Sequence, residues 1–428
     1  MARIAVIGAG SGYMPGVIRG LLYRAGDLAG SELVFHDPDR DHLELMTTLA
    51  GRMFAARDAD FTVRAETDLT KALDGVEFVF TTFRPGGLAA RHLDESIPLA
   101  HGVVGQETAG PGGFLMACRS VPVLLRIAAI LADVAPDAWI VNYTNPTNIV
   151  TDAVTRYSDA RIVGLCDQHV GDTATWARLL DLGDPAGLEV DWIGLNHATW
   201  AERVRRNGTD ISGEVAARLD ALDPAAAGED ERLARIGRAL GLLANSYSRY
   251  YLFHDETVAD LRAKGTTRAQ DITAMLPGYY EAVAAEALRD DPDPGRERGG
   301  GEHGEFAVDA ICAIARDEGR RLIVNTRNRG ALSDLEHEAI VEVPCVVGAA
   351  GPVPLVQGAL PRQVRGLTQA VHCYERLAAD AAATGSRRLA RQALLAHPFV
   401  RSVPVAEAIL AEGLRAHAAH LPQFAGGG

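Results

Sequence analysis

Two residues that can bind a metal ion each follow a short apolar segment. Cys166 comes after Ile162-Val163-Gly164-Leu165, and His197 comes after Trp192-Ile193-Gly194-Leu195-Asn196. A thiolate and an imidazole are too few ligands for a closed tetrahedral zinc site, but they can form an open divalent site that substrate oxygens and water complete. The alternative is structural, because single cysteines and histidines are often buried in a core. The pair indicates Lewis-acid chemistry only if the fold brings both residues together.

A glycine-rich turn near the N-terminus could bind a dinucleotide. An apolar strand runs directly into the turn Gly8-Ala9-Gly10-Ser11-Gly12-Tyr13. Such a turn lets the backbone approach a diphosphate at a helix N-terminus, although Tyr13 stands where the G-x-G-x-x-G pattern has its third glycine. Asp37 ends a second apolar segment, where a carboxylate can bind both ribose hydroxyls and repel a 2′-phosphate, which favours NAD over NADP. The alternative is an ordinary strand-to-helix turn.

Three polar segments follow predicted strands or helices and could contact a sugar. The segment Thr81 to Gly87 contains Arg84, the glycine-rich segment His101 to Phe114 contains Glu107, and the segment Val141 to Asn148 contains Asn145. Amide groups can donate to and accept from sugar hydroxyls. We expect these segments to fold over a cofactor and a sugar; a mobile surface loop and a plain Asn-Pro turn are the alternatives.

Strands and helices alternate through the first third of the chain. The expected strands are Arg3 to Ile7, Leu33 to His36, Glu77 to Thr82 and Trp139 to Tyr143; the expected helices are Pro15 to Tyr23, Arg40 to Phe54 and Val121 to Leu131. Alternation of this kind predicts parallel strands joined by right-handed crossovers. We therefore predict a Rossmann-type, doubly wound parallel sheet over residues 1–165.

The pattern changes in the remainder, for which we predict a second, mixed α/β domain over residues 166–428. The expected elements are strands at Glu189 to Leu195, Arg321 to Asn325 and Ile340 to Pro344, a long helix at Asp230 to Tyr251, a loop at Asp290 to Gly301, helices from Leu360 onward and a disordered tail at Gly426 to Gly428.

Composition excludes several classes of protein. The net charge of the 428 residues is −14 and no basic stripe is present, so we expect no nucleic-acid partner. The longest apolar stretch, Val121 to Ala135, contains Arg126 and Asp133 and is shorter than the roughly 20 residues of a membrane span, so we expect no membrane association. The five cysteines are widely spaced and lack a C-x-x-C pattern, which predicts reduced thiols. The N-terminal segment Met1 to Ile7 runs directly into the glycine turn without the long apolar segment of a signal peptide, so we expect a cytoplasmic location.

The motifs taken together resemble glycoside hydrolase family 4, the NAD-dependent 6-phospho-glycosidases. The resemblance rests on the segments Gly8-x-Gly10-Ser11, Arg84-x-Gly86-Gly87-x-x-x-Arg91-x-x-Asp94-Glu95, Gly105-Gln106-Glu107-Thr108, Thr144-Asn145-Pro146, Gly164-Leu165-Cys166, Gly194-Leu195-Asn196-His197 and Val341-Glu342-Val343-Pro344. The match extends over nearly the whole chain. The resemblance implies a fold like that of lactate and malate dehydrogenases.

The resemblance also implies an elimination that is assisted by a transient oxidation. NAD takes hydride from C3 of the sugar, a divalent metal polarises the oxygens on C2 and C3, and a tyrosine removes the C2 proton so that the group on C1 departs. Water then adds and hydride returns to C3. The resemblance implies that Cys166 and His197 bind the metal, which is expected to be Mn²⁺. Tyr247 is our candidate for the base, with Tyr250 and Tyr251 as reserves.

The same resemblance assigns the remaining site residues. Arg84 is expected at the cofactor, Arg91, Glu107 and Asn145 at the sugar, and Arg268 at a C6 phosphate. The substrate would be a phosphorylated disaccharide or glucoside, and the protein a homodimer or homotetramer.

Two departures from the family pattern leave the substrate open. Overall resemblance favours a 6-phospho-β-glucosidase, but Asp167 follows the metal-binding cysteine, as in α-acting members, where it protonates the leaving oxygen. The segment Arg298 to Glu305 lacks the Tyr-Ser pair of relatives, which leaves another anionic group at C6 as an alternative. Outside the family, the alternatives are an NAD-dependent 2-hydroxy-acid dehydrogenase and a catalytically silent nucleotide sensor.

Overall fold

Strand β1 (Arg3–Ile7) lies inside a parallel sheet and is almost entirely buried. It pairs in parallel with β2 (Ser31–His36) on one side and β4 (Phe78–Thr81) on the other, and the six parallel strands follow the order β3-β2-β1-β4-β5-β6. This is the strand order of a Rossmann fold, so the predicted fold class is confirmed. The computed structural model describes residues 1–293, 295 and 303–425.

The sheet continues beyond β6 as an antiparallel half, to a total of 12 strands among the described residues. The other strands of the sheet are β3 (Phe61–Glu66), β5 (Trp139–Asn142), β6 (Arg161–Gly164), β8 (Ile193–Leu195), β9 (Ala198–Ala201), β12 (Leu243–Ala244), β13 (Arg320–Arg327), β14 (Ile340–Gly348) and β15 (Gly351–Pro354). The two halves meet where Asn325 of β13 pairs with Gly164 of β6. A small separate sheet holds β7 (Leu188–Val190), β10 (Val204–Arg206) and β11 (Thr209–Asp210).

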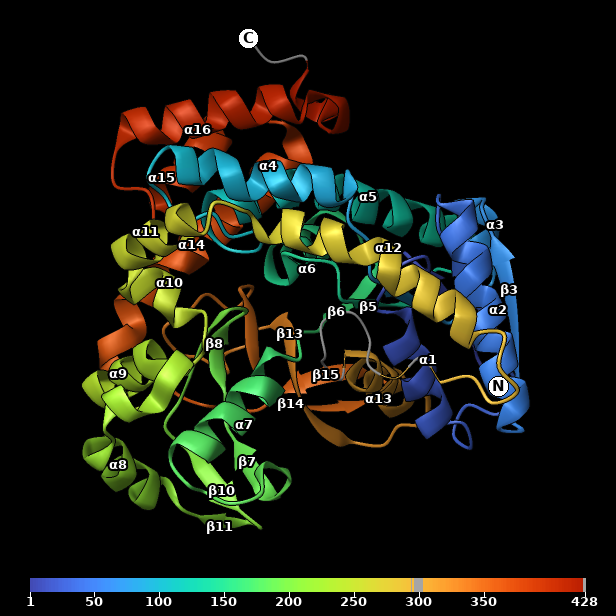
Figure 1. Cartoon of the computed structure of the whole chain (residues 1–428), viewed down its shortest axis with the longest axis horizontal. Coiled ribbons are helices and arrows are strands. Elements are labelled where there is room, and N and C mark those ends of the chain that lie inside the picture. The colour runs from blue at the N-terminus through green and yellow to red at the C-terminus, as the bar shows by residue number, and fades with distance from the viewer. Residues whose placement is uncertain (294, 296–302, 426–428) are drawn as a thin grey trace.

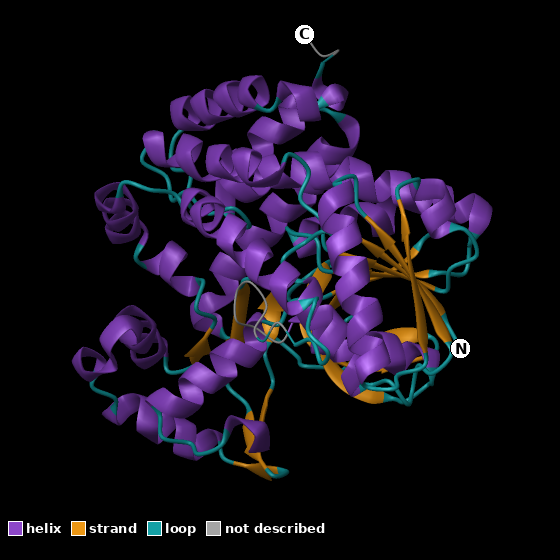
Figure 2. Ribbon diagram, turned by 45° about the vertical axis from the view of Figure 1, so that its right-hand side comes forward, coloured by secondary structure: helices purple, strands orange, loops and turns teal. Residues whose placement is uncertain are grey.

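Helices cover both faces of the large sheet (Figures 1 and 2). The helices are α1 (Met14–Tyr23), α2 (Arg40–Ala56), α3 (Leu69–Leu73), α4 (Gly87–Ala100), α5 (Gly110–Val134), α6 (Thr147–Tyr157), α7 (Gln168–Leu179), α8 (Ser212–Ala221), α9 (Glu231–Leu240), α10 (Ser248–Leu252), α11 (His254–Lys264), α12 (Arg268–Glu286), α13 (His303–Ala315), α14 (Arg362–Thr384), α15 (Arg387–Ala396) and α16 (Val403–Ala416). One core joins the sheet to α1, α2 and α13, and a second joins it to α5, α6 and α14–α16. A third core surrounds Trp176, Trp192 and Trp200.

Helix α5 is the one described helix that is long and apolar enough to cross a membrane by length and composition. It lies in the second core, and 67% of its most apolar window is buried inside the protein. A buried helix of a globular core passes the same test, so this helix is accounted for by packing.

Three predicted elements differ in extent from the observed ones. The long helix expected at Asp230 to Tyr251 is divided into α9, β12 and α10, because Gly241 adopts a left-handed conformation (φ +69°) that ends α9. The glycine-rich segment before Phe114 is a loop only as far as Ala109, since α5 begins at Gly110. The strand expected at Glu189 to Leu195 is two strands, β7 and β8.

Two further predictions fall partly or wholly outside the described residues. The loop predicted at Asp290 to Gly301 overlaps residues 294 and 296–301, and the tail at residues 426–428 lies outside them entirely. The division into residues 1–165 and 166–428 stays a prediction. One continuous sheet contains strands from both of these ranges, and they meet where β13 pairs with β6.

Candidate active site

The carboxyl ends of β1, β2, β4 and β5 border one cleft of about 340 Å³. Because parallel strands end at the same edge of a sheet, residues far apart in sequence meet there. The predicted residues that line the cleft are Gly8, Gly10, Ser11, Gly12, Asp37, Arg84, Glu107 and Asn145. The structure therefore brings the residues predicted for the cofactor together with two of those predicted for the sugar.

The glycine turn packs too closely for side chains. Gly8 has φ +96°, and a Cβ atom there would lie 2.5 Å from the Thr82 carbonyl oxygen. The Gly10 amide donates a hydrogen bond of 2.9 Å to Asp37 Oδ2. Asp37 thus lies beside the turn, in the position where a carboxylate can reach an adenine ribose.

Helix α12 covers this turn from the second half of the chain. The hydroxyl of Tyr280 donates to the Gly10 carbonyl at 2.9 Å, and that of Tyr279 donates to the Gly12 carbonyl at 2.8 Å. The ring of Tyr280 also stacks on His42 with the centroids 3.9 Å apart. These contacts fix the turn from the side of its carbonyl groups; sequence reasoning missed them because more than 260 residues separate the partners.

Cys166 and His197 come together beside the cleft. Cys166 lies two residues after β6 and His197 two residues after β8, and Cys166 Sγ is 3.6 Å from His197 Nε2. His197 has φ +62°, a left-handed conformation that is uncommon for a residue with a side chain. Among the described residues, no third Cys, His, Asp or Glu completes a metal cluster with this pair. The donor set therefore fits an open site.

A chain of hydrogen bonds fixes which nitrogen of His197 carries the proton. Gln106 Oε1 accepts from the Thr108 amide, the Ala109 amide and the Thr108 hydroxyl. Because the Thr108 hydroxyl donates to Gln106, its oxygen must accept from His197 Nδ1, which lies 3.0 Å away. The Nε2 lone pair then points toward Cys166 and is available to a metal. Sequence reasoning did not assign roles to Gln106 and Thr108.

The acid–base properties of the pair also fit a metal. Burial lowers the pKa of His197 to about 3, so its imidazole stays neutral, as a metal ligand must. Burial, followed by the charges of Glu342 and Asp167, raises the pKa of the Cys166 thiol well above its usual value. A divalent cation would reverse this effect and hold the thiolate.

The buried carboxyl group of Glu342 acts on the Cys166 thiol. Glu342 of β14 is fully buried, and its Oε2 accepts a hydrogen bond of 2.7 Å from Asn196 Nδ2. The charge of Glu342 raises the pKa of the Cys166 thiol, and the Asn196 side chain acts in the opposite direction. Burial raises the pKa of Glu342 to about 7. The segment around Glu342 was recognised as a motif, but nothing in its local sequence indicated this contact.

Tyr247 lies against the His197 ring. The two rings are 3.9 Å apart and nearly parallel, at 4°. Burial raises the pKa of Tyr247 well above 10, and the charges of Tyr250, Cys166 and Glu107 act in the same direction. Tyr250 contacts the edge of Tyr247, whereas Tyr251 packs on His397 and Phe399 in the second core. Of the three candidate tyrosines, Tyr247 contacts the predicted metal ligand.

Arg84 and Glu107, which line the cleft, belong to a network of arginines and glutamates. Glu107 forms ion pairs with Arg84 and with Arg91. In the second pair, Glu107 Oε1 lies 2.9 Å from Arg91 Nη1. Arg91 Nε also donates to Glu95 at 2.7 Å. Glu95 in turn accepts from the Ala269 amide at the start of α12. This network joins the cleft wall to the same helix that covers the glycine turn.

The two remaining predicted residues lie at helix N-termini. Asp167 is the N-cap residue of α7, directly after Cys166. Arg268 is the first residue of α12; its side chain is exposed and does not line the described cleft. The roles assigned to these two residues stay predictions.

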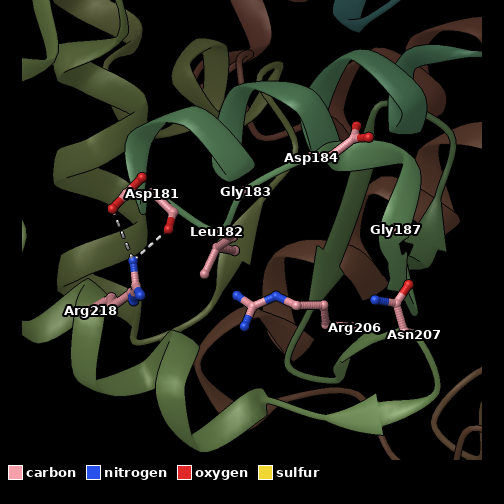
Figure 3. A pocket seen from close by; sticks show the side chains of 8 residues that line it. All are labelled: Asp181, Leu182, Gly183, Asp184, Gly187, Arg206, Asn207 and Arg218. Atoms are coloured by element: carbon pink, nitrogen blue, oxygen red, sulfur yellow. Dashed lines mark hydrogen bonds and ion pairs between the residues drawn. The ribbon is translucent and has the colours of Figure 1, made fainter.

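A further hollow, of about 490 Å³, lies near the C-terminal end of α7 and lacks the features of an active site (Figure 3). Its Arg218 donates to the backbone carbonyls of Leu180 and Asp181. Its Arg206 pairs with Glu214. The arginines of this hollow are thus explained by local structure.

Comparison with known proteins agrees with the geometry. The model of the family 4 glycosyl hydrolases matches residues 3–182, and that of the family 4 C-terminal domain matches residues 192–400. A probable 6-phospho-β-glucosidase of Bacillus subtilis is 37% identical over 99% of this chain and 98% of its own length.

Solved structures show the same relationship. The Thermotoga maritima 6-phospho-β-glucosidase with manganese, NAD⁺ and glucose 6-phosphate has a TM-score of 0.88 at 30% identity, over 98% of this chain and 99% of that one. A 6-phospho-α-glucosidase from gut microorganisms, with NAD and Mn²⁺, has a TM-score of 0.86 at 26% identity, over 99% of both chains. A lactate dehydrogenase from Eimeria maxima shares the fold alone, with a TM-score of 0.53 at 14% identity over 86% of this chain and 90% of that one. Cys166 follows the last parallel strand and lies beside His197, as the family resemblance implied. The family models span most of the sequence, so this chain belongs to the family 4 glycosyl hydrolases.

Proposed function

We propose that this chain hydrolyses glucosides that carry a phosphate on C6, with NAD and a divalent metal, expected to be Mn²⁺, as cofactors. The observation that carries the proposal is the position of the Cys166–His197 pair beside the cleft that contains the glycine turn. Glu107 lines the cleft, and the next residue, Thr108, bonds to His197. A redox cofactor and a metal ion could therefore act on one sugar ring.

The cofactors define what the protein must supply. When bound, NAD would take up and return hydride and the metal would polarise neighbouring sugar oxygens. Cys166 and His197 would hold the metal, Thr108 would keep His197 in the ligating tautomer, and the glycine turn with Asp37 and Arg84 would bind NAD. Because the hydride returns at the end of each turnover, hydrolysis would leave no net NADH.

Tyr247 would remove the proton on C2. A phenol whose pKa lies above 10 is a poor base at neutral pH. A cation held by Cys166 and His197 would lower that pKa, since the Tyr247 ring is 3.9 Å from the His197 ring. This proximity supports Tyr247 as the base that the proposed metal would activate.

The sugar would bind between Asn145 and the network of Arg91 and Glu107, and Arg268 would contact the C6 phosphate. The planar guanidinium group of Arg268 can donate two parallel hydrogen bonds to phosphate oxygens. We propose the β-anomer as the preferred substrate. The α-anomer is the second candidate, because Asp167 adjoins Cys166 and could protonate a leaving oxygen.

We also propose that the protein is cytoplasmic and forms a homodimer or homotetramer, without nucleic-acid or membrane partners. The five cysteines, all within the described residues, are free thiols. Free thiols are typical of a reducing compartment.

The test is hydrolysis of the α- and β-anomers of p-nitrophenyl glucoside 6-phosphate, with NAD and Mn²⁺ each added or omitted. We expect release of nitrophenol from the β-anomer only when both cofactors are present, without accumulation of NADH. Release from the α-anomer instead would assign the role of acid to Asp167. Net NADH formation from a 2-hydroxy acid would replace the proposal with a dehydrogenase, and no release from either anomer would contradict phosphate as the C6 group.

A further inference from the structure

Helix α7 connects Cys166 to the segment of residues 244–246, which ends directly before the proposed base. The helix begins at Gln168, two residues after Cys166. Gln168, Asp172 and Trp176 are spaced by four residues, so they lie on one face of the helix over successive turns. Each of them forms a hydrogen bond to residues 244–246. One helix thus joins the predicted metal ligand to the segment that carries the proposed base.

This face of the helix holds both the backbone and the side chain of Ser246. Asp172 Oδ1 accepts from the Ser246 amide at 3.2 Å, and Gln168 Nε2 donates to the Ser246 hydroxyl at 2.9 Å. Gln168 Nε2 also donates to Asp172 Oδ1 at 3.0 Å, which links the two holding groups. One turn further along the helix, Trp176 Nε1 donates to the Ala244 carbonyl at 2.8 Å. The residue before the proposed base is therefore fixed at several points.

Asn245 ties the same segment to the strand that follows His197. Its amide donates to the Thr199 carbonyl at 3.0 Å, and its Nδ2 donates to Thr199 Oγ1 at 3.2 Å. Thr199 belongs to β9 and lies two residues after His197. Asn245 Oδ1 in turn accepts from the Tyr247 amide at 2.9 Å. The backbone at Tyr247 is thus joined to both predicted metal ligands, through α7 on one side and β9 on the other.

Asp172 places a carboxyl group in a buried position. Its side chain is 1% exposed, and Trp176, the next residue on the same face, belongs to the third core. Burying a carboxyl group costs free energy unless hydrogen bonds compensate for the lost water. Packing alone would therefore favour an apolar side chain at position 172, whereas an acceptor there satisfies the Ser246 amide.

We propose that Asp172 and Gln168 are positioning residues, which fix the backbone before Tyr247 and so keep its hydroxyl group within reach of the C2 proton of the sugar. This proposal rests on the proposed function, in which Tyr247 removes that proton. Neither Asp172 nor Gln168 lines the described cleft. Displacement of a reacting group by about 1 Å can cost about 100-fold in rate. Loss of either contact should therefore lower kcat and leave the binding of substrate, NAD and metal unchanged.

The first test is Gln168→Met, which removes both hydrogen bonds of the Gln168 amide and keeps an unbranched side chain of similar length. Hydrolysis of the anomer of p-nitrophenyl glucoside 6-phosphate that the wild type cleaves is measured with NAD and Mn²⁺, on substrate with hydrogen or deuterium at C2. We expect kcat to fall about 10-fold, while KM and the affinities for NAD and Mn²⁺ stay constant. The C2 isotope effect should stay at or above the wild-type value, because removal of this proton then limits turnover.

Two variants of Asp172 test its role as an acceptor. Asp172→Leu removes the acceptor of the Ser246 amide, and kcat should fall about 100-fold. Asp172→Asn keeps an oxygen acceptor at the same position and should recover most of this loss. If Asp172→Leu does not fold, Gln168→Met decides the question alone.

Hydrogen exchange of the peptide that covers residues 242–253 gives a readout that needs no turnover. Exchange within this peptide should be about 10-fold faster in Gln168→Met and Asp172→Leu, because the lost hydrogen bonds no longer hold the segment. Equal thermal midpoints of Gln168→Met and the wild type show that the effect is local. Exchange at the wild-type rate in Gln168→Met would mean that α7 does not hold this segment through Gln168.

Gln423→Met is the matched control. Gln423 is also partly buried, and its amide donates to the Cys118 and Ala382 carbonyls, outside the described cleft. Its replacement should leave kcat and the exchange of residues 242–253 unchanged. Wild-type kcat in Gln168→Met, a C2 isotope effect below that of the wild type, a comparable loss of Mn²⁺ affinity, or an equal fall of kcat in the control overturns the proposal. Wild-type protein that cleaves neither anomer contradicts the proposed function instead, and with it the premise of this proposal.

Discussion

Replacement of Thr108 by valine should weaken metal binding without removing a metal ligand. The Thr108 hydroxyl is the acceptor for His197 Nδ1–H, and His197 is only 5% exposed, so water cannot take its place. Loss of a partner for a buried donor costs about 1–3 kcal/mol. At about 1.4 kcal/mol for each factor of ten, the affinity for Mn²⁺ should fall roughly 5- to 150-fold.

Titration of the NAD-loaded protein with Mn²⁺, followed by the electron paramagnetic resonance signal of the free ion, measures this effect. Thr108→Ser keeps the hydroxyl group and should restore most of the affinity. Thr47→Val is the matched control, because it removes a hydroxyl hydrogen bond of 2.7 Å to the Leu43 carbonyl on α2, away from the cleft. Unchanged Mn²⁺ affinity in Thr108→Val, with NAD still bound, would refute the inferred tautomer of His197.

Two other predictions concern the same site, and a third concerns Asp172, which accepts a hydrogen bond from the amide of Ser246, the residue before Tyr247. Tyr247→Phe keeps the ring on His197 and removes only the proposed base, so kcat should fall at least about 100-fold while the affinities for NAD and Mn²⁺ stay constant. Cys166→Ser and His197→Ala should each abolish Mn²⁺-dependent turnover and leave NAD binding nearly intact. Burial raises the pKa of Asp172 from 3.8 to about 7, so the folded state binds its proton more tightly and loses stability as pH rises between these values. Asp172→Asn should make the thermal midpoint less dependent on pH over this range.

Each of these predictions has an outcome that contradicts it. Tyr247→Phe with wild-type kcat would transfer the role of base to Tyr250. Full activity of Cys166→Ser or His197→Ala in the presence of a chelator would exclude the metal from the mechanism. An Asp172→Asn variant whose midpoint falls with pH as steeply as that of wild type would mean that Asp172 is not the group that titrates.

The Rossmann half could be predicted from sequence because its signals are local. The strand before Gly8, the turn itself and Asp37 lie within about 40 residues, and each has a characteristic residue type. Strand β3 was missed because Phe61–Glu66 lies at the edge of the sheet and none of its residues is fully buried, so its sequence lacks a buried-strand pattern. The broken helix after Asp230 depended on the conformation of one glycine, Gly241.

The site was predictable only as far as residue types reveal chemistry. Cys166 and His197 could be identified because each follows an apolar strand. The Thr108–His197 and Asn196–Glu342 bonds join residues that are 89 and 146 positions apart, and only the completed sheet brings them together. For Arg268 the residue type suggested a phosphate ligand, but residue type does not reveal position: the side chain is exposed and does not line the described cleft.

The junction of the two sheet halves at Gly164 has a consequence for the reaction. A Cβ atom on Gly164 would lie 2.9 Å from Asn325 Cβ and 2.5 Å from Thr151 Oγ1. The parallel and antiparallel halves therefore meet backbone to backbone, and the width of the junction is set by the absence of one side chain. Cys166 follows β6 in the parallel half, and His197 follows β8 in the antiparallel half, so the two proposed metal ligands lie on either side of this junction. A spacer as small as a methyl group at position 164 would therefore move Cys166 away from His197 and weaken the metal site itself.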